Sequence, residues 1–574
     1  MINARNSDHT RYCEDYLQAS ANETPGQTAE RFHILGLAQL EKNRVALGIK
    51  LLHRSIEVKG DEAAVYFNLG NALCKINSLD EAIASFETAL EIDASFTAAR
   101  YNRAYVLVRL KRFDDALVDY NLVLLAQPEH AKAHLNRGNV LRELNRPQDA
   151  LNSYERSLAL MPTDPEALCG YGAALHDLGR YEEAVQRYTS ALQLRPEYVD
   201  ALSNRGASLR RLYRHTEALN DYECALTINP GNIATLVNKG NALRELCQVE
   251  EALHCFLAVQ AIDPMCNEAH MGEFYCRHLL GEMKTSWEKY EWRRKDDQSP
   301  LARRQFSAPL WLGNFDVKGK VILLHAEQGF GDIIQFSRYS KLVSRLGAKV
   351  ILEVPLAMER LLGKLEGVDQ LIVRGAPLPH IDCQCPLMSL PLALGTTQES
   401  VPCDGPYLHC PQKIREAWRN RLVSGKGRRV GVAWSGNPAH DNDINRSISL
   451  QDFSELFSPA AQFCCLQKEI REGDLTVLRD IATVPSFCNN LTDFMETAGL
   501  IANMDLVVSV DTSVAHLAAA MGKPTWILLP FNVEWRWLLD RSDSPWYPTV
   551  RLFRQSIPGD WRHVITSVAH ELLT

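Results

Sequence analysis

The 574-residue chain lacks an apolar run long enough to cross a bilayer, and its first residues, MINARNSDHT, lack the apolar core of a secretory signal. Its fifteen cysteines include no CxxC pair: Cys383 and Cys385 form a CxC, and Cys464 and Cys465 are adjacent. An odd and scattered set favours free buried thiols in a reducing compartment over a disulfide framework or a zinc site. We therefore expect a cytoplasmic protein with no membrane span.

The chain also lacks a large excess of one charge. Its 62 basic and 70 acidic residues leave a net charge of −8, which disfavours nucleic acid as the main partner. The remaining composition is that of an ordinary globular protein. A chain of 574 residues is too long for a single core, so we expect three or more domains.

A 34-residue period runs through the first half of the chain. Small residues at this spacing let two helices of one unit approach, an aromatic residue fills the gap between units, and a proline ends the second helix. This pattern resembles the tetratricopeptide repeat, with seven repeats over Ala29–Pro264 and a degenerate eighth in which Tyr290 continues the aromatic series. The series are Gly36, Gly70, Ala104, Gly138, Gly172, Gly206 and Gly240; Ala82, Ala116, Ala150, Ala184, Ala218 and Ala252; Phe86, Tyr120, Tyr154, Tyr188, Tyr222 and Phe256; and Pro128, Pro162, Pro196, Pro230 and Pro264.

Asparagine recurs at one repeat position, two residues before the small residue. Repeats of this kind form a curved solenoid whose groove is lined mainly by the first helix of each pair. The asparagine is either simply tolerated there or forms an amide ladder that binds the backbone of an extended peptide. A similar ladder in the O-GlcNAc transferases, which also join such repeats to a glycosyltransferase, favours the second alternative. The ladder residues are Asn68, Asn102, Asn136, Asn204 and Asn238.

In the second half, short β-branched runs such as KVILLHA, AKVILEVP, RVGVAWSG and MDLVVSVDT alternate with helical stretches. Strand–helix–strand alternation predicts parallel sheets covered on both faces. A break near residues 402–428 divides the strands into two doubly wound halves. Ligands of such sheets bind at the carboxyl ends of the strands, which would border a cleft between the halves.

Four strand ends carry polar residues. At the first, Gly329 and Gly331 permit a tight turn, and Asp332 is either a helix N-cap or a general base at the cleft. The second carries Arg446, a fixed cation for a phosphate, after a DND sequence that we interpret as a polar loop and not as a metal site. The third offers contacts to a ribose or base, through Gln467, Lys468 and Glu469.

At the fourth strand end, backbone amides open a helix that suits a phosphate. Its residues are Asp511, Thr512, Ser513, Val514 and His516. The next strand is followed by an aromatic run, and we expect its residues 534–537 to divide between cleft lining and packing, because adjacent side chains point in different directions.

The sequences GFGDIIQF, GVAWSGNP, NRSISL and SVDTSVAHLAAAMGKPTWILLP resemble glycosyltransferase family 9, the heptosyltransferases, and more closely bacterial proteins that fuse tetratricopeptide repeats to such a domain. The resemblance implies a GT-B fold with two Rossmann-like domains, no metal or cofactor, and inversion by direct displacement. It implies that Asp332 is the base, that Arg446 contacts the donor phosphates, and that residues 511–516 bind the diphosphate. Arg446 replaces a lysine common in the family, and Ser513 replaces its usual glycine, which leaves the donor sugar open.

Two functions follow from these residues. The first is a hexosyl- or heptosyltransferase that uses a nucleotide-sugar and binds a protein or peptide through its repeats. The second is a repeat-based interaction scaffold with a nucleotide-binding but inactive domain. The expected organisation is an N-terminal extension (1–28), tetratricopeptide repeats (29–296), a linker (297–320), an acceptor-side domain (321–412), a nucleotide-sugar-side domain (425–556) and a C-terminal helix (557–574).

Overall fold

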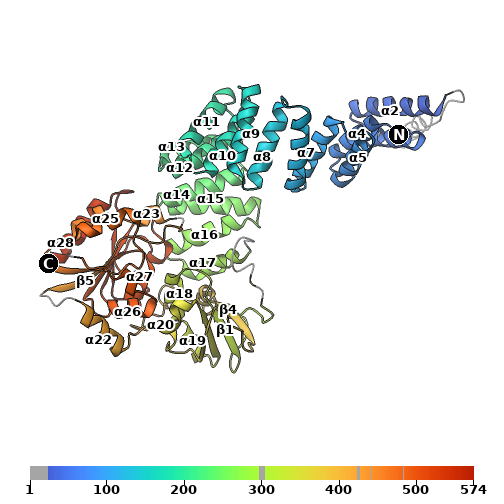
Figure 1. Cartoon of the computed structure of the whole chain (residues 1–574). Coiled ribbons are helices and arrows are strands. Elements are labelled where there is room, and N and C mark those ends of the chain that lie inside the picture. Colours follow the sequence, from blue (N-terminus) through green and yellow to red (C-terminus); the bar gives the residue numbers. More distant parts are fainter. Residues whose placement is uncertain are drawn as a thin grey trace. The chain divides into compact units, whose positions relative to one another are not determined.

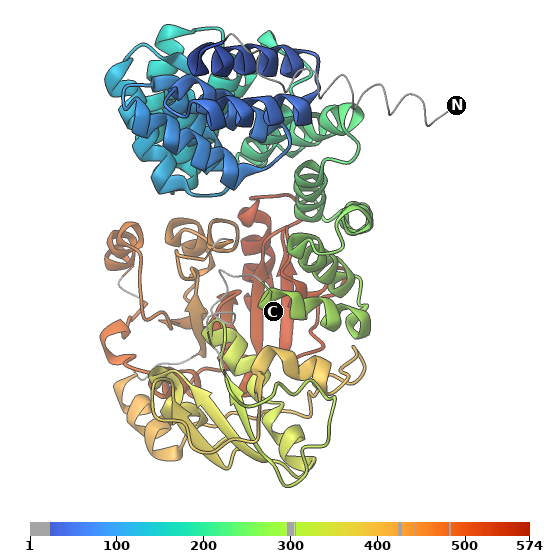
Figure 2. The ribbon, with the colours of Figure 1, turned by 90° about the vertical axis from the view of Figure 1, so that its right-hand side faces the viewer.

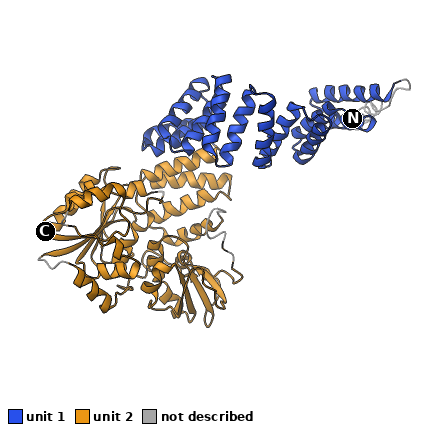
Figure 3. Ribbon diagram, in the orientation of Figure 1, with its two compact units in different colours: residues 1–230 blue, residues 231–574 orange. Residues whose placement is uncertain are grey.

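The computed structural model describes residues 23–295, 304, 306–422, 427–440, 442–481 and 484–573. The chain divides into two compact units, Met1–Pro230 (unit 1) and Gly231–Thr574 (unit 2) (Figure 3). The predicted order, a solenoid of helical repeats followed by an α/β part with parallel sheets, is confirmed. Most of the predicted N-terminal extension and the first part of the predicted linker lie outside the described residues.

Unit 1 consists of consecutive helix pairs in the predicted 34-residue register. The first helix among the described residues begins at Pro25, four residues before the expected start, because Thr24 and Gln27 form a capping box that fixes its first turn. The helices are α2 (Pro25–Glu41), α3 (Val45–Val58), α4 (Ala63–Lys75), α5 (Leu79–Ile92), α6 (Thr97–Arg109), α7 (Phe113–Ala126), α8 (Ala131–Glu143), α9 (Pro147–Leu160), α10 (Pro165–Asp177), α11 (Tyr181–Leu194), α12 (Val199–Arg211) and α13 (His215–Ile228).

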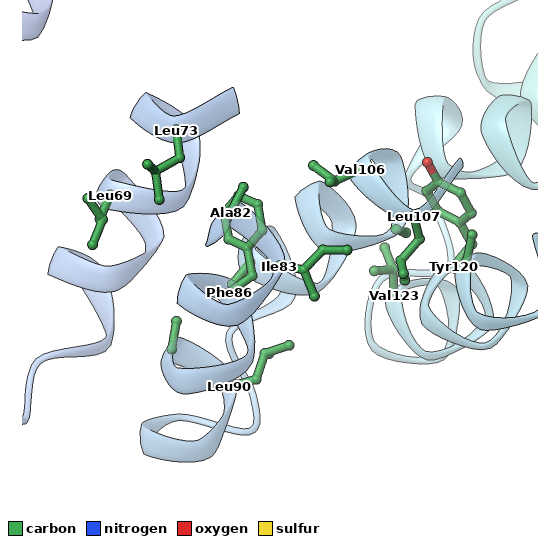
Figure 4. Packing of buried hydrophobic residues seen from close by; sticks show 14 of the residues in the cluster. Leu69, Leu73, Ala82, Ile83, Phe86, Leu90, Val106, Leu107, Tyr120 and Val123 are labelled. Carbon is green, nitrogen blue, oxygen red and sulfur yellow. The ribbon is translucent and has the colours of Figure 1, made fainter. Parts of the chain in front are cut away.

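The repeat core packs an aromatic ring against the small residue of the same repeat. Phe86 is fully buried, and a Cβ added at Gly70 would lie 2.6 Å from its Cε1 atom, so a side chain at residue 70 would displace the ring. Leu69, Leu73 and Ala82 belong to the same buried cluster (Figure 4). The close approach inferred from the small residues is therefore present.

Unit 2 begins with two further helix pairs, α14 (Ile233–Glu245) with α15 (Val249–Ile262), and α16 (Asn267–Leu279) with α17 (Met283–Tyr290), followed by a 3-10 turn, η1 (Glu291–Arg294). Helix α17 has 8 residues, whereas α15 has 14. The division between the compact units thus falls at Pro230 and not in the predicted linker, because α16 and α17 pack on the α/β part.

The strands of unit 2 form two separate parallel sheets, with orders β3-β2-β1-β4 and β6-β5-β7-β8-β9 (Figure 2). Apart from the edge strand β3, each strand is buried along most of its length, as sheets covered on both faces require. The strands are β1 (Val321–His325), β2 (Lys349–Val354), β3 (Gln370–Val373), β4 (Cys383–Pro386), β5 (Arg428–Ala433), β6 (Ala461–Cys465), β7 (Leu506–Val510), β8 (Thr525–Leu529) and β9 (Val550–Arg554).

Helices connect these strands (Figure 1). Among the described residues, no helix combines the length and apolar character needed to span a membrane. The described cysteines are all free thiols, and six of them are buried. The helices are α18 (Phe330–Ser337), α19 (Ser340–Arg345), α20 (Glu359–Leu362), α21 (Leu390–Ala393), α22 (Gln412–Arg421), α23 (Asp443–Arg446), α24 (Leu450–Phe453), α25 (Glu472–Asp480), α26 (Phe494–Ile501), α27 (Ser513–Ala520) and α28 (Trp561–Leu573).

Candidate functional site

The first predicted strand end, after β1, places Asp332 in the first turn of α18. The N-cap residue is Gly329, not Asp332, and the Gly329 N–H donates to Asp332 Oδ2 at 2.8 Å. The second carboxylate oxygen accepts a hydrogen bond from the Arg536 guanidinium. Asp332 thus stabilises the start of the helix with one oxygen from position N3 and pairs with a cation through the other. The predicted N-cap role is wrong, and the role of Asp332 as a general base stays a prediction.

Arg536 links Asp332 to a second carboxylate, Glu534. Arg536 lies in a 3-10 turn, η6 (Trp535–Trp537), is 8% exposed, donates to both carboxylates, and donates from Nε to Gln335 Oε1 at 2.9 Å. Burial, reinforced by the charges of Asp511 and Asp332, raises the pKa of Glu534 to about 7 although Arg536 opposes this shift. Two carboxylates therefore contact one buried guanidinium, and the charge of a third, Asp511, also raises the pKa of Arg536.

The side chains of 534–537 alternate in direction, as expected from the sequence. Glu534 and Arg536 reach toward Asp332, whereas Trp535 and Trp537 are buried in packing contacts. Trp537 stacks on the ring of His516 with centroids 5.3 Å apart. The aromatic run after β8 thus supplies both a polar and an apolar side to the site.

The strand end after β7 holds Asp511 and the start of α27. The first intrahelical bond runs from the His516 N–H to the Thr512 carbonyl, so the half-buried amides before it are available to an anion. Burial raises the pKa of Asp511, but His516, whose Nε2 lies 3.6 Å from Oδ1, and Arg446 outweigh it and bring the value to about 2. His516 Nδ1 also lies 3.0 Å from the Tyr547 hydroxyl.

Arg446 reaches this same strand end from α23. Its Nη1 donates to the Asp511 carbonyl at 3.1 Å, and its Nε lies 3.4 Å from Asp443 Oδ1. Asp443 also accepts a hydrogen bond from Arg471, whose Nη2 donates to Ser447 Oγ at 2.9 Å. Arg471 is a second cation at this edge that the sequence analysis missed, because it follows a strand by six residues and belongs to no recognisable motif.

Gln467 holds the loop after β5 in place. Its Oε1 accepts hydrogen bonds from the Trp434 N–H at 2.6 Å and the Ser435 N–H at 3.0 Å, and its Nε2 donates to Ser435 Oγ at 3.0 Å. These bonds give Gln467 a role in shaping the loop. Lys468 and Glu469 are exposed beyond the end of β6, and their contact with a nucleoside stays a prediction.

The two strand ends on different sheets meet directly. Helices α18 and α27 pack against each other, and a Cβ added at Gly331 would lie 2.9 Å from His516 Cδ2. Gly331 therefore permits the close approach of the Gly-Asp turn to the 511–516 segment. This contact brings Asp332, Arg536 and Asp511 into one site, although 179 residues separate Asp332 from Asp511 in the sequence (511 − 332).

Three asparagines of the predicted ladder bond to the preceding repeat. Asn68 Nδ2 lies 2.9 Å from His33 Nε2, Asn102 Nδ2 donates to Asn71 Oδ1 at 2.6 Å, and Asn136 Nδ2 donates to the Tyr101 hydroxyl at 2.9 Å. The amide nitrogens thus join consecutive repeats, a role that the sequence analysis did not consider. Peptide binding by the ladder, including the half-buried Asn204 and Asn238, stays a prediction.

Within the described ranges, no three acidic, histidine or cysteine side chains converge in an arrangement suited to a metal ion. The Asp441 of the DND sequence lies outside those ranges.

Comparison with protein families matches two parts of the chain. The profile of glycosyltransferase family 9 (heptosyltransferase) matches residues 463–528, which include Gln467–Glu469 and the 511–516 segment but neither Asp332 nor Arg446. Profiles described as TPR repeat and tetratricopeptide repeat match residues 70–111 with 172–212, and 101–167. The chain thus joins tetratricopeptide repeats to a segment that matches the profile of glycosyltransferase family 9.

Each of the similar proteins matches only part of this chain. Protein FlbA of Caulobacter vibrioides is 26% identical over 318 residues, which are 51% of this chain and 53% of that protein, so the chain spans about half of this curated relative. YrrB, a TPR protein with an unusual peptide-binding site, is 28% identical over 32% of this chain and 95% of its own (TM-score 0.29). A tetratricopeptide repeat protein of Parabacteroides merdae is 21% identical over 42% and 94% (TM-score 0.38).

Proposed function

We propose that the protein is a metal-independent, inverting glycosyltransferase of the GT-B type that moves a sugar from a nucleotide-sugar to an acceptor hydroxyl. The observation that carries the proposal is the convergence of Asp332, Arg446 and the 511–516 segment at strand ends of two sheets. A carboxylate from one sheet then faces an anion-binding helix start from the other, as a displacement at a sugar carbon requires.

The donor diphosphate binds at the start of α27. The amides of Thr512, Ser513 and Val514 supply hydrogen-bond donors, and Arg446 and Arg471 supply positive charge at the same edge. As the sugar–phosphate bond breaks, negative charge grows on the leaving diphosphate. Fixed donors in a partly buried site stabilise that charge without reorganising, which lowers the barrier.

Asp332 accepts the proton of the acceptor hydroxyl while the hydroxyl oxygen attacks the anomeric carbon of the sugar. Because the nucleotide diphosphate leaves from the opposite side, the configuration at that carbon inverts. The Gly329 N–H and Arg536 hold the carboxylate in one orientation. Arg536 also donates to Glu534, so the guanidinium is shared between two carboxylates. The nucleotide-sugar is a substrate, and the mechanism needs no cofactor.

The repeats bring the acceptor or a partner. The ladder asparagines lie half-buried on the first helix of their repeats, and three of them bond to the preceding repeat through their amide nitrogens. Their amide oxygens would then accept hydrogen bonds from the backbone of a bound peptide. A protein or peptide acceptor in a cytoplasmic setting suits this arrangement. One observation favours the alternative, an inactive nucleotide-binding scaffold: the Asp332 carboxylate is already paired with Arg536.

The test uses the full chain. Thermal-shift screening with ADP-, UDP-, GDP- and dTDP-sugars identifies the donor, and mass measurement of proteins incubated with it detects transfer. Asp332→Asn should keep the donor shift and lower transfer by about 10²–10⁴-fold. The control is Glu366→Gln, an exposed carboxylate on the same half of unit 2, which should leave transfer unchanged. Unchanged transfer in Asp332→Asn removes the base role, and a donor shift without any transfer supports the scaffold.

A further inference from the structure

The eighth helix pair, α16 and α17, departs from the repeat pattern at residues that contact the α/β part. Phe274 stands 34 residues after Gly240, in the slot of the small residue, and Trp287 stands 34 residues after Leu253. In five of the seven preceding pairs a glycine in this slot makes room for an aromatic ring of the same repeat, whereas Phe274 occupies the slot itself. These substitutions therefore change what the repeat packs against.

The changed residues surround Trp535. The Trp535 ring lies 5.4 Å from Phe274, 4.6 Å from His278 and 5.7 Å from Trp287, measured between centroids. All four side chains are buried, and burial lowers the pKa of His278 to about 3, so its ring is neutral among the aromatic rings. Trp535 is the neighbour of Arg536, which donates to Asp332, so this aromatic box holds the turn that carries the guanidinium.

A second contact holds the loop that carries Asp332. From the 3-10 turn η1, the buried Arg293 donates to both oxygens of Glu327 at 3.0 Å. Glu327 also accepts the Met388 N–H at 3.0 Å, and the next residue, Gln328, donates to the Tyr290 hydroxyl at 3.1 Å. Glu327 and Gln328 directly precede the turn that begins α18. The eighth helix pair and the η1 turn that follows it therefore contact this loop through an ion pair and a hydrogen bond.

We propose that the eighth helix pair is a positioning element of the glycosyltransferase site and not a further peptide-binding repeat. One rigid helix pair contacts two loops from different sheets, one with Asp332 and one with Arg536, and fixes their distance. Loops have few backbone bonds of their own, so packing of this kind decides how often they open. The inference rests on the proposed function for its catalytic meaning, but the contacts make a prediction that needs no substrate.

The experiment measures hydrogen–deuterium exchange on the full chain. In Trp287→Leu, the aliphatic residue of the other repeats replaces the indole, so the helix pair keeps a compatible core. Peptides covering 326–333 and 531–538 should exchange at least ten-fold faster, while α16 itself stays protected. Trp287→Phe should restore most of the protection. The matched control, Phe86→Leu in unit 1, should leave both loops unchanged.

Unchanged exchange in both loops of Trp287→Leu, or an equal rise in Phe86→Leu, overturns the proposal. If Trp287→Leu unfolds α16, Glu327→Gln replaces it: this variant keeps the acceptor for the Met388 N–H and should speed exchange in 326–333 alone. Thermal shifts with ADP, UDP, GDP and dTDP should persist in all variants, because none of the substituted residues belongs to the nucleotide site at the start of α27. A nucleotide shift in no variant, with faster loop exchange, would refute the glycosyltransferase and leave the positioning role intact.

Discussion

Replacing Arg293 by methionine should destabilise unit 2 strongly. Arg293 is 7% exposed, and it bonds to Glu327, whose side chain is 1% exposed, as well as to Ser389 Oγ and the Tyr290 carbonyl. The variant removes the cation and leaves Glu327 buried without its ionic partner. Breaking a buried ion pair on one side costs about 3–5 kcal/mol, because the remaining charge is neither hydrated nor neutralised.

The cost should depend on pH, since the variant can protonate Glu327. Burial already raises the pKa of Glu327 while Arg293 opposes the shift, so removing Arg293 raises this pKa further. Between the unfolded pKa and the raised folded pKa, the native state binds more protons than the unfolded state. Its stability therefore falls as pH rises, by at most about 1.4 kcal/mol per pH unit. The variant should be less impaired at pH 5 than at pH 8.

Urea unfolding followed by tryptophan fluorescence measures this cost selectively, because all ten tryptophans lie at residue 287 or later and so report unit 2. The double variant Arg293→Met with Glu327→Gln should recover at least about 2 kcal/mol, since residue 327 is then neutral and Glu291, the other carboxylate paired with Arg293, keeps its ion pair with Arg294. A single variant that costs under about 1 kcal/mol, or a double variant that loses the sum of both single effects, would refute the reasoning.

Three further predictions concern the site and the repeats. Gly331→Ala places a Cβ 2.9 Å from His516 Cδ2 and should destabilise unit 2 by about 1–3 kcal/mol in the same fluorescence assay; a change near zero would mean that the two strand ends are not packed. Burial raises the pKa of Glu534 from its ordinary value of 4.5 to about 7, so the stability of unit 2 falls as pH rises between these values, and Glu534→Gln should reduce this slope, by at most about 3 kcal/mol in total. Asn136→Ala loses the bond to the Tyr101 hydroxyl and should lower unit 1 stability by about 1 kcal/mol in far-ultraviolet circular dichroism, with no change in tryptophan fluorescence.

Local patterns in the sequence were sufficient for much of the architecture. A helical repeat buries the same positions in every copy, so the 34-residue recurrence of small and aromatic residues predicted the helix pairs directly. The alternation of buried strands and helices predicted two parallel sheets in the same way. The strand ends were predictable as well, because a polar residue directly after a buried strand must lie at the carboxyl edge of the sheet.

Contacts between distant side chains were not predictable. The bond from Arg536 to Asp332 joins residues 204 positions apart, and the donor nitrogens of the asparagines found partners in the preceding repeat. The eighth repeat looked merely degenerate, since its altered residues make sense only against Trp535. The periodicity of the sequence does not indicate which loops face each other in the folded chain.

The sequence by itself therefore determined the elements and the edges of the sheets at which polar groups gather. Only the tertiary structure decided that Asp332 is shared between a helix start and a buried guanidinium, that Gly331 admits His516, and that the last helix pair packs on the α/β part. The physical reason is that periodic burial is a property of neighbouring residues in the chain, whereas ion pairs and close packing depend on which surfaces folding brings together.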